Sequence, residues 1–264
     1  QYSSGWSIRA GGQFNAIDNT NNPETGVYPL IPDYRQFESG AFIVWEKSQG
    51  RLLYEGGARY DFVMQNVVRL SRSVPREILR NNNNYHNISA ASGLSYIVND
   101  NFSLVSNVGL ARRNPAINEL YSQGLHQGVS GIEEGDPNLS TEKSVKTSVG
   151  LKFSNRKTFT FESLIYHQLV KDYIFLNPQD QIRLTIRGSF PVFAYEQTDA
   201  RISGMDLSTS GQISKSFTLK ASYSYINGAD VSTDLPLVFM PSNTMNGRLS
   251  YEYPNTIKFG KYKM

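Results

Sequence analysis

Apolar and polar residues alternate with a period of two along much of the chain. In Arg51–Phe62 the even positions are apolar, aromatic or small, whereas the odd positions carry the charges of Glu55, Arg59 and Asp61. Successive side chains of a β-strand point to opposite faces of the sheet. The pattern therefore predicts a strand with one apolar and one charged face.

The same alternation predicts the other strands. It is strong in Ser144–Phe153 and Phe217–Gly228. Weaker versions occur in Trp6–Asp18, Phe37–Lys47, His86–Val98, Phe102–Ala111, Thr158–Ile174, Ala200–Ile213 and Asn246–Tyr253. No segment has the 3.6-residue period of an amphipathic helix. The sequence predicts an all-β chain of about ten strands.

The connections between these segments alternate in length. The short, polar ones are Ser48–Gly50, Asn99–Asn101, Ser154–Lys157 and Ser214–Ser216. The long ones are roughly Asn19–Gln36, Gln65–Tyr85, Arg112–Glu142, Leu176–Thr198 and Ala229–Thr244. In an antiparallel up-and-down meander every second connection falls at the same end, so one end is predicted to carry tight turns and the other large loops.

Outer-membrane β-barrels have this asymmetry, with short periplasmic turns and long extracellular loops. Several strand ends are aromatic, which suits the interfacial girdles of such barrels: Trp45, Tyr60, Tyr96, Phe102, Phe153, Phe159, Tyr225 and Tyr253. The pattern therefore favours part of a transmembrane β-barrel. The alternative is a water-soluble β-sheet protein, such as an adhesin or a glycan-binding module, with one face on its own core.

Composition narrows the class further. The 264 residues are 39% hydrophobic and contain no cysteine, which excludes disulfides and thiolate sites. No apolar run approaches the ~20 residues of a membrane helix. The net charge of +3 is spread out, so a nucleic-acid surface is not expected. The nucleophile-elbow, phosphate-loop and His-Glu-x-x-His motifs of common enzymes are absent from the sequence, and no resident cofactor is expected.

One segment, Ala111–Ser144, follows neither hydrophobic period. It contains Pro115 and Pro137, one histidine and two adjacent glutamates. Unstructured connections of this length are usually functional or disordered. We therefore expect an outward-facing loop between two strands.

Three stretches in and after this segment resemble TonB-dependent outer-membrane receptors. In that family a strand ends in Arg-x-Pro, followed by Glu-Leu, a variable loop, Gly-Asn-Pro-x-Leu, and Glu-x-Ser opening the next strand. The matching positions are Arg113, Pro115, Glu119, Leu120, Gly135, Pro137, Leu139, Glu142 and Ser144, with Asp136 in place of the usual Asn. FAYEQTDARISGMDLS, with Ala200 and Gly204, and LPLVFMPSNTMNGRLSYEY are similar to later family segments.

The resemblance implies a receptor in the outer membrane of a Gram-negative bacterium. Its ligand would be scarce, a ferric siderophore first, with haem, zinc, cobalamin or a glycan as alternatives. Energy would come from TonB acting on a plug domain. Residues 1–264 show no plug, TonB-contacting box or signal peptide, and stop at Lys263–Met264 rather than on an aromatic residue. We expect a single-domain fragment of a 22-stranded barrel lacking its last strands, with two edge strands open to self-association.

His126 is the candidate ligand for a metal or haem iron, because neutral imidazole suits both. Haem receptors of the resembled family place a histidine similarly. The alternative is a loop histidine that packs against Tyr121 or is solvated. Glu133 and Glu134 are candidate oxygen ligands or, alternatively, exposed solvating charges.

Two arginines end the strand before the loop. Arg112 and Arg113 are candidates for attracting an anionic siderophore into the barrel mouth. Arg113 is equally a candidate brace that pairs with Glu119 or Glu142. The inward strand positions predict a polar wall that would hold the plug: Arg51, Glu55, Arg59, Asp61, Lys146, Lys152, Lys220, Arg248 and Glu252.

Overall fold

The computed structural model describes residues 5–26, 28–71, 73–155 and 158–252. Part of the predicted turn at 154–157, Tyr253 and the stretch from Lys261 to Met264 lie outside these residues. The described chain consists almost entirely of β-strands, with one short α-helix and one short 3-10 helix, η1 (Pro23–Thr25). The predicted all-β class is confirmed.

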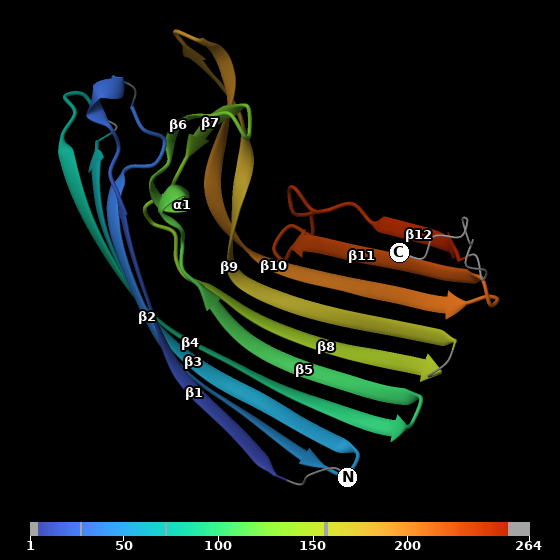
Figure 1. The fold of residues 1–264 in the computed structure, drawn as a ribbon. Coiled ribbons are helices and arrows are strands. Elements are labelled where there is room, and N and C mark those ends of the chain that lie inside the picture. Colours follow the sequence, from blue (N-terminus) through green and yellow to red (C-terminus); the bar gives the residue numbers. More distant parts are fainter. Residues whose placement is uncertain (1–4, 27, 72, 156–157, 253–264) are drawn as a thin grey trace, which may run out of the picture.

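Ten strands pair side by side in one curved sheet, in the order of the chain. They are β1 (Trp6–Asn19), β2 (Asp33–Gln49), β3 (Leu52–Leu70), β4 (Ile78–Asn99), β5 (Phe102–Arg113), β8 (Glu142–Asn155), β9 (Phe159–Thr185), β10 (Gly188–Gln212), β11 (Phe217–Asp230) and β12 (Thr244–Tyr251). Every neighbouring pair on this path is antiparallel. The predicted meander is therefore present, and the sheet bends into an open trough (Figure 1) with no pairing between β1 and β12 in the described residues.

The registers assign each side chain to one face of the trough. Leu110 on β5 lies opposite Val145 on β8, which in turn lies opposite Leu169 on β9. These residues are on the outward face, where large apolar side chains are exposed, as with Val149 at 58% and Ile165 at 60%. In a membrane barrel such positions contact lipid. We call the outward apolar rows of the ten strands the apolar band.

The strands are longer than the sequence predicts, and the expected loops are correspondingly shorter. The pairing of β3 with β4 extends outward to the last residue of β3, Leu70, and the first residue of β4, Ile78. The pairing of β9 with β10 likewise extends to Thr185 and Gly188. The prediction of long loops at 65–85 and 176–198 was therefore wrong. Beyond the apolar band the outward face of a strand no longer meets lipid, so the regular apolar alternation is interrupted while the backbone pairing continues. The run Asn81–Asn84 within β4 illustrates this.

The expected loop after β5 is folded. It contains α1 (Ile117–Tyr121), β6 (Gln123–His126) and β7 (Gly131–Glu134). β6 pairs with β7, and β7 lies parallel to β10. In Figure 1 these elements lie between the upright parts of β2–β4 and of β9–β10. Within the described ranges, no helix combines the length and the apolar content needed to span a membrane.

Candidate functional site

Residues 114–141, which we call the mouth unit, fill the outer end of the trough. The unit begins at an ionic clamp. Arg113 Nη1 donates to both oxygens of Glu119 at 2.9 Å, while Nε and Nη2 donate to Glu142 at 2.6 and 2.8 Å. The hydrogen bonds that Arg113 donates to Glu142 are the main reason that the pKa of Arg113 lies above its usual range. Both glutamates are largely buried, so the clamp fixes the first turn of α1 to the start of β8.

The same carboxylates also hold backbone groups. Glu119 accepts a hydrogen bond from the amide of Ala116 at 2.7 Å, which satisfies one free donor at the start of α1. Glu142 accepts from the amide of Ile174 on β9 at 2.6 Å. Pro115, which precedes the helix, is fully buried. The ion pairs that the sequence offered as one alternative for Arg113 are present.

The turn after β7 passes close against α1. A Cβ atom on Gly135 would lie 2.5 Å from the backbone of Leu120 and Tyr121, so only glycine fits. The amides of Gly135 and Asp136 donate to the carbonyls of Ser122 and Glu119 at 2.8 and 2.9 Å. Beyond them, the Asp136 carboxylate accepts from the amide of Asn138 at 2.9 Å, across the exposed Pro137. Asp136 thus performs the turn-forming role expected of the usual Asn.

The mouth unit has an apolar core that joins it to both walls of the trough. Its own members are Ile117, Leu120, Tyr121 and Leu139, with Leu120 only 1% exposed. They pack against Val67 on β3, Ile174 on β9, Tyr34 on β2 and Tyr195 on β10. The unit therefore bridges strands that are distant in the sheet.

Polar side chains strengthen the same bridge. On the β4 side, Asn83 donates to the Tyr121 hydroxyl at 3.0 Å. On the β10 side, Asn118 donates to the Tyr195 hydroxyl at 3.0 Å. Burial raises the pKa of Tyr195, and of Tyr85 on β4, to about 12. Both phenols are accordingly neutral at physiological pH, and that of Tyr195 accepts the hydrogen bond from Asn118.

His126, at the end of β6, is held by a buried carboxylate. Its Nδ1 lies 2.5 Å from Glu133 Oε2 on β7, and Glu133 is 2% exposed. The imidazole itself is 43% exposed. A carboxylate on one ring nitrogen fixes the orientation of a histidine and strengthens the other nitrogen as a ligand. Nε2 faces Gly128, where a Cβ would lie only 3.1 Å away.

The remaining predicted residues occupy separate surroundings. Glu134 pairs with Arg183 Nη1 on the outer part of β9 at 2.5 Å. Arg112 is opposite Lys143 in the register and belongs to the outward face, away from the mouth unit. Ser144 is opposite Ala111 on β5 and Val170 on β9 in the register, and all three residues belong to the inward face of the trough. The buried Ala200 packs with Val170 and Leu237 in a second small core.

Gly204 lies further along β10, opposite Tyr166 in the register. The Tyr166 ring covers Gly204 so closely that a Cβ there would overlap it.

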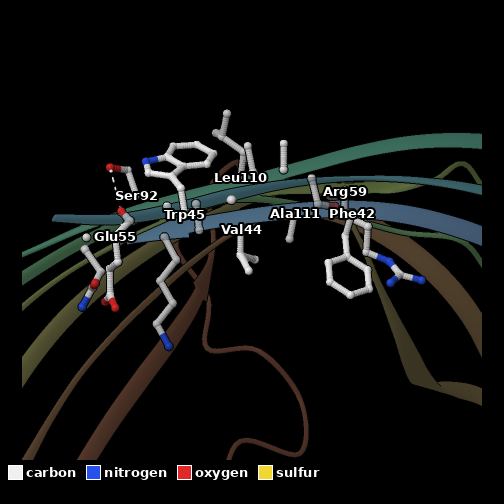
Figure 2. Close-up of a pocket in the computed structure, with 18 of the residues that line it drawn as sticks. Phe42, Val44, Trp45, Glu55, Arg59, Ser92, Leu110 and Ala111 are labelled. Carbon is white, nitrogen blue, oxygen red and sulfur yellow. Dashed lines mark hydrogen bonds between the residues drawn. The ribbon is translucent and has the colours of Figure 1, made fainter. Parts of the chain in front are cut away.

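The hollow of the trough below the mouth unit has a volume of about 920 Å³. In Figure 2, Phe42, Val44 and Arg59 project to one side of the sheet and Trp45 and Leu110 to the other. The residues that line the hollow include several small ones on two neighbouring strands, β3 and β4: Gly56, Gly57, Ala58, Ala90, Ala91 and Gly93. Predicted wall residues Glu55, Arg59 and Lys146 line it as well.

Among the described residues, no group of three or more His, Asp or Glu side chains gathers in a way that would hold a metal ion. His126 and Glu133 come together, whereas His86 and His167 bond Tyr60 and Ser203 on the outward face. Sequence reasoning missed the residues that hold the mouth unit from other strands, chiefly Asn83, Arg183, Tyr195 and Gln197. The side-chain amide of Gln197 accepts a hydrogen bond from the backbone N–H of Ser140 and donates one to the Ser140 carbonyl, both at 2.8 Å.

The chain matches one protein-family model, described as TonB dependent receptor-like, beta-barrel, over residues 1–262. No curated protein matches it by sequence. Its fold resembles that of solved structures. "Copper transporter OprC" has a TM-score of 0.74 at 20% identity, with 96% of this chain and 40% of that chain covered.

Two further structures are similar. The FrpB iron transporter from Neisseria meningitidis (F3-3 variant) has a TM-score of 0.60 at 16% identity, covering 96% of this chain and 38% of that one. A double mutant of the Serratia marcescens hemophore receptor HasR, in complex with its hemophore HasA and heme, has a TM-score of 0.63 at 16% identity. It covers 85% and 41% of the two chains. The chain thus spans about two fifths of each of these proteins.

Proposed function

Because the chain belongs to the TonB-dependent receptor β-barrel family, which its match over residues 1–262 establishes, we propose that it is part of a receptor for a scarce metal-containing ligand. Barrels of this family reside in the outer membrane of Gram-negative bacteria. The exposed apolar band is the surface that such a barrel presents to lipid. The folded mouth unit, fixed to both walls of the trough, is the observation that carries the proposal.

A ferric siderophore is the first candidate ligand, as the resemblance to the family implies. The names of the similar structures include copper, iron and heme, and they support a metal-containing ligand more broadly. In the complete protein, TonB would act on a plug domain inside the barrel. The inward charged residues of the hollow, such as Glu55 and Arg59, would contact that plug.

Growth tests the proposal directly. A strain that lacks the full-length gene should fail to grow when iron is supplied only as the transported chelate, and the intact gene should restore growth. Inactivating TonB should abolish this rescue. A full-length protein that conducts ions freely but supports growth on no chelated metal would indicate a porin and contradict the proposal.

One observation favours haem as a second candidate ligand. His126 is oriented by the buried Glu133, leaving Nε2 as a nitrogen that can bind iron. The described residues place no further carboxylate or imidazole ligands around it. A single histidine suits iron already held in a macrocycle, since haem needs the protein for axial ligands only.

Haemin titration of the full-length protein separates the two ligands. For a haem receptor, His126→Gln should remove the Soret shift that haemin binding produces, and Glu133→Gln should weaken binding by about 10- to 100-fold, as for other partners of histidine ligands. His167→Gln is the matched control, because His167 faces outward and bonds Ser203. Unchanged haemin binding in His126→Gln would contradict the haem assignment and leave the siderophore proposal intact.

A further inference from the structure

Three basic residues form a row across neighbouring strands on the outward face. Arg112 on β5 is opposite Lys143 on β8, and Lys143 is opposite Lys171 on β9. All three residues are exposed. Residues paired across antiparallel strands share a face, and adjacent strands lie about 4.8 Å apart. We call Arg112, Lys143 and Lys171 the basic row.

The basic row marks the outer edge of the apolar band. Two residues further along each strand toward the tight turns, the same face carries Leu110, Val145 and Leu169. These side chains are 52%, 43% and 50% exposed. Three consecutive strands therefore change from apolar to basic at the same register position, which is where a membrane barrel passes from hydrocarbon to lipid headgroups.

The charges of the row are poorly balanced within the described chain. Lys143 Nζ lies 3.9 Å from Asp172 Oδ2, a distance at the limit of an ion pair. A second acidic residue, Asp199, lies next to Asp172 and accepts a hydrogen bond from the Asp172 amide at 3.0 Å. In the part of the chain that the structure describes, the side chains of Arg112 and Lys171 have no hydrogen bond or ion pair. Arg201 on β10, by contrast, pairs with Asp234.

Such a row is unfavourable without a bound anion, because like charges directly opposite on neighbouring strands repel. Phosphate is the anion that the row fits best, since arginine binds it through two parallel hydrogen bonds and lysine as a point charge. Basic residues beside a membrane surface also attract anionic headgroups. A phosphate carried by a lipid reaches the row with its acyl chains already against Leu110, Val145 and Leu169.

We propose that the basic row binds the phosphates of an anionic lipid headgroup in the outer leaflet of the outer membrane. The site faces away from the mouth unit, so it is independent of the ligand that the receptor takes up. The bound lipid offsets the repulsion within the row and fixes the height of the barrel in the membrane.

Lipid binding by the full-length protein tests this proposal. The purified protein in neutral detergent is titrated with lipid A, a glycolipid with two phosphates, and with the same lipid after phosphatase treatment, and native mass spectrometry counts the bound lipids. Each basic residue near an anionic surface contributes roughly fivefold to affinity. The triple variant Arg112→Gln, Lys143→Gln, Lys171→Gln should bind lipid A about a hundredfold more weakly.

The matched control removes the same charge from the inward face, through Lys152→Gln, Lys220→Gln and Arg248→Gln, and should retain lipid A. In the unmodified protein, raising the salt concentration should weaken binding, a result that does not depend on any variant folding. Retention of the phosphatase-treated lipid, displacement by equimolar inorganic phosphate, or undiminished binding by the outward variant would each overturn the proposal.

Discussion

The outer end of the sheet and the apolar band differ in where their apolar side chains lie. Among the described residues, most of the buried apolar side chains belong to the mouth unit and the adjoining outer parts of the strands, as with Leu120, Val67 and Ile174. In the band, residues such as Val149 and Ile165 are exposed. The outer end is thus stabilised like a water-soluble protein, through a packed core, whereas the band relies on lipid to cover its apolar face.

The largest expected difference in stability is between two leucine-to-alanine substitutions, one in the mouth unit and one in the apolar band. Leu120→Ala leaves a cavity in the core of the mouth unit and should lower its free energy of opening by about 3 kcal/mol. Leu104→Ala, in the band, should cost less than about 1 kcal/mol, because lipid chains replace the lost contacts. Amide hydrogen exchange of residues 123–134 in the full-length protein measures the opening. Equal effects of the two substitutions would remove the distinction between the regions.

The ionic clamp should rank second. Arg113→Gln leaves Glu119 and Glu142 largely buried without their cation, which should cost on the order of 2 kcal/mol. The arginine side chain is 46% exposed, so the loss should be smaller than for a fully buried pair. The neighbouring Arg112→Gln is the control and should change exchange of the mouth unit by less than about 0.5 kcal/mol. A similar loss in both variants would point to net charge rather than the clamp.

Alkaline pH should open the mouth unit before it disturbs the band. Burial raises the pKa of Tyr85 and Tyr195 to about 12 from the ordinary value of 10.0. A pKa that folding raises contributes stability that is complete below the unfolded value and is lost as pH rises toward the folded value. The protection of the unit's amides, relative to their intrinsic base-catalysed exchange rates, should therefore fall between about pH 10 and pH 12. The double variant Tyr85→Phe, Tyr195→Phe should flatten this dependence, and an unchanged profile would contradict it.

The smallest effect is expected at Ser122. Its side chain is fully buried, and its Oγ is the one buried side-chain polar atom of the described residues without a hydrogen-bond partner. Removing an unsatisfied hydroxyl takes away a desolvation cost and leaves little cavity, so Ser122→Ala should be neutral or stabilise the unit by up to about 1 kcal/mol. Clear destabilisation, measured by the same exchange, would show that the hydroxyl has a partner.

The sequence predicts the strands of the apolar band better than it predicts the structure of the mouth unit and the outer strand parts around it. The alternation in Ser144–Phe153 reproduces most of β8 because lipid on one side and a polar wall on the other impose a period of two. The outer part of β9 begins with three successive apolar residues, Ile174, Phe175 and Leu176, followed by Asn177 and Pro178, so the alternation breaks there although Ile182 and Leu184 resume it further out. Its pairing with β10 could not be read from side-chain pattern alone.

Some contacts of the candidate site can also be predicted from the sequence, whereas others cannot. The ion pairs of Arg113 with Glu119 and Glu142 could be anticipated, because those residues frame the ends of the loop. The contact of Asn118 with Tyr195 joins residues 77 positions apart, and only the curvature of the sheet brings them together. No local signal marks Tyr195, Asn83 or Arg183 as partners of the mouth unit.

The parallel pairing of β7 with β10 has a consequence for the order of assembly. Ile132 pairs with Val192, so the mouth unit depends on a strand that follows it only after the whole of β8 and β9. Contacts with such long sequence separation form late, because a large loop must close first. We therefore expect residues 114–141 to stay accessible to protease in a partly inserted barrel and to become protected once β10 has joined the sheet. Protection of residues 114–141 from protease would then indicate that the strands up to β10 have assembled.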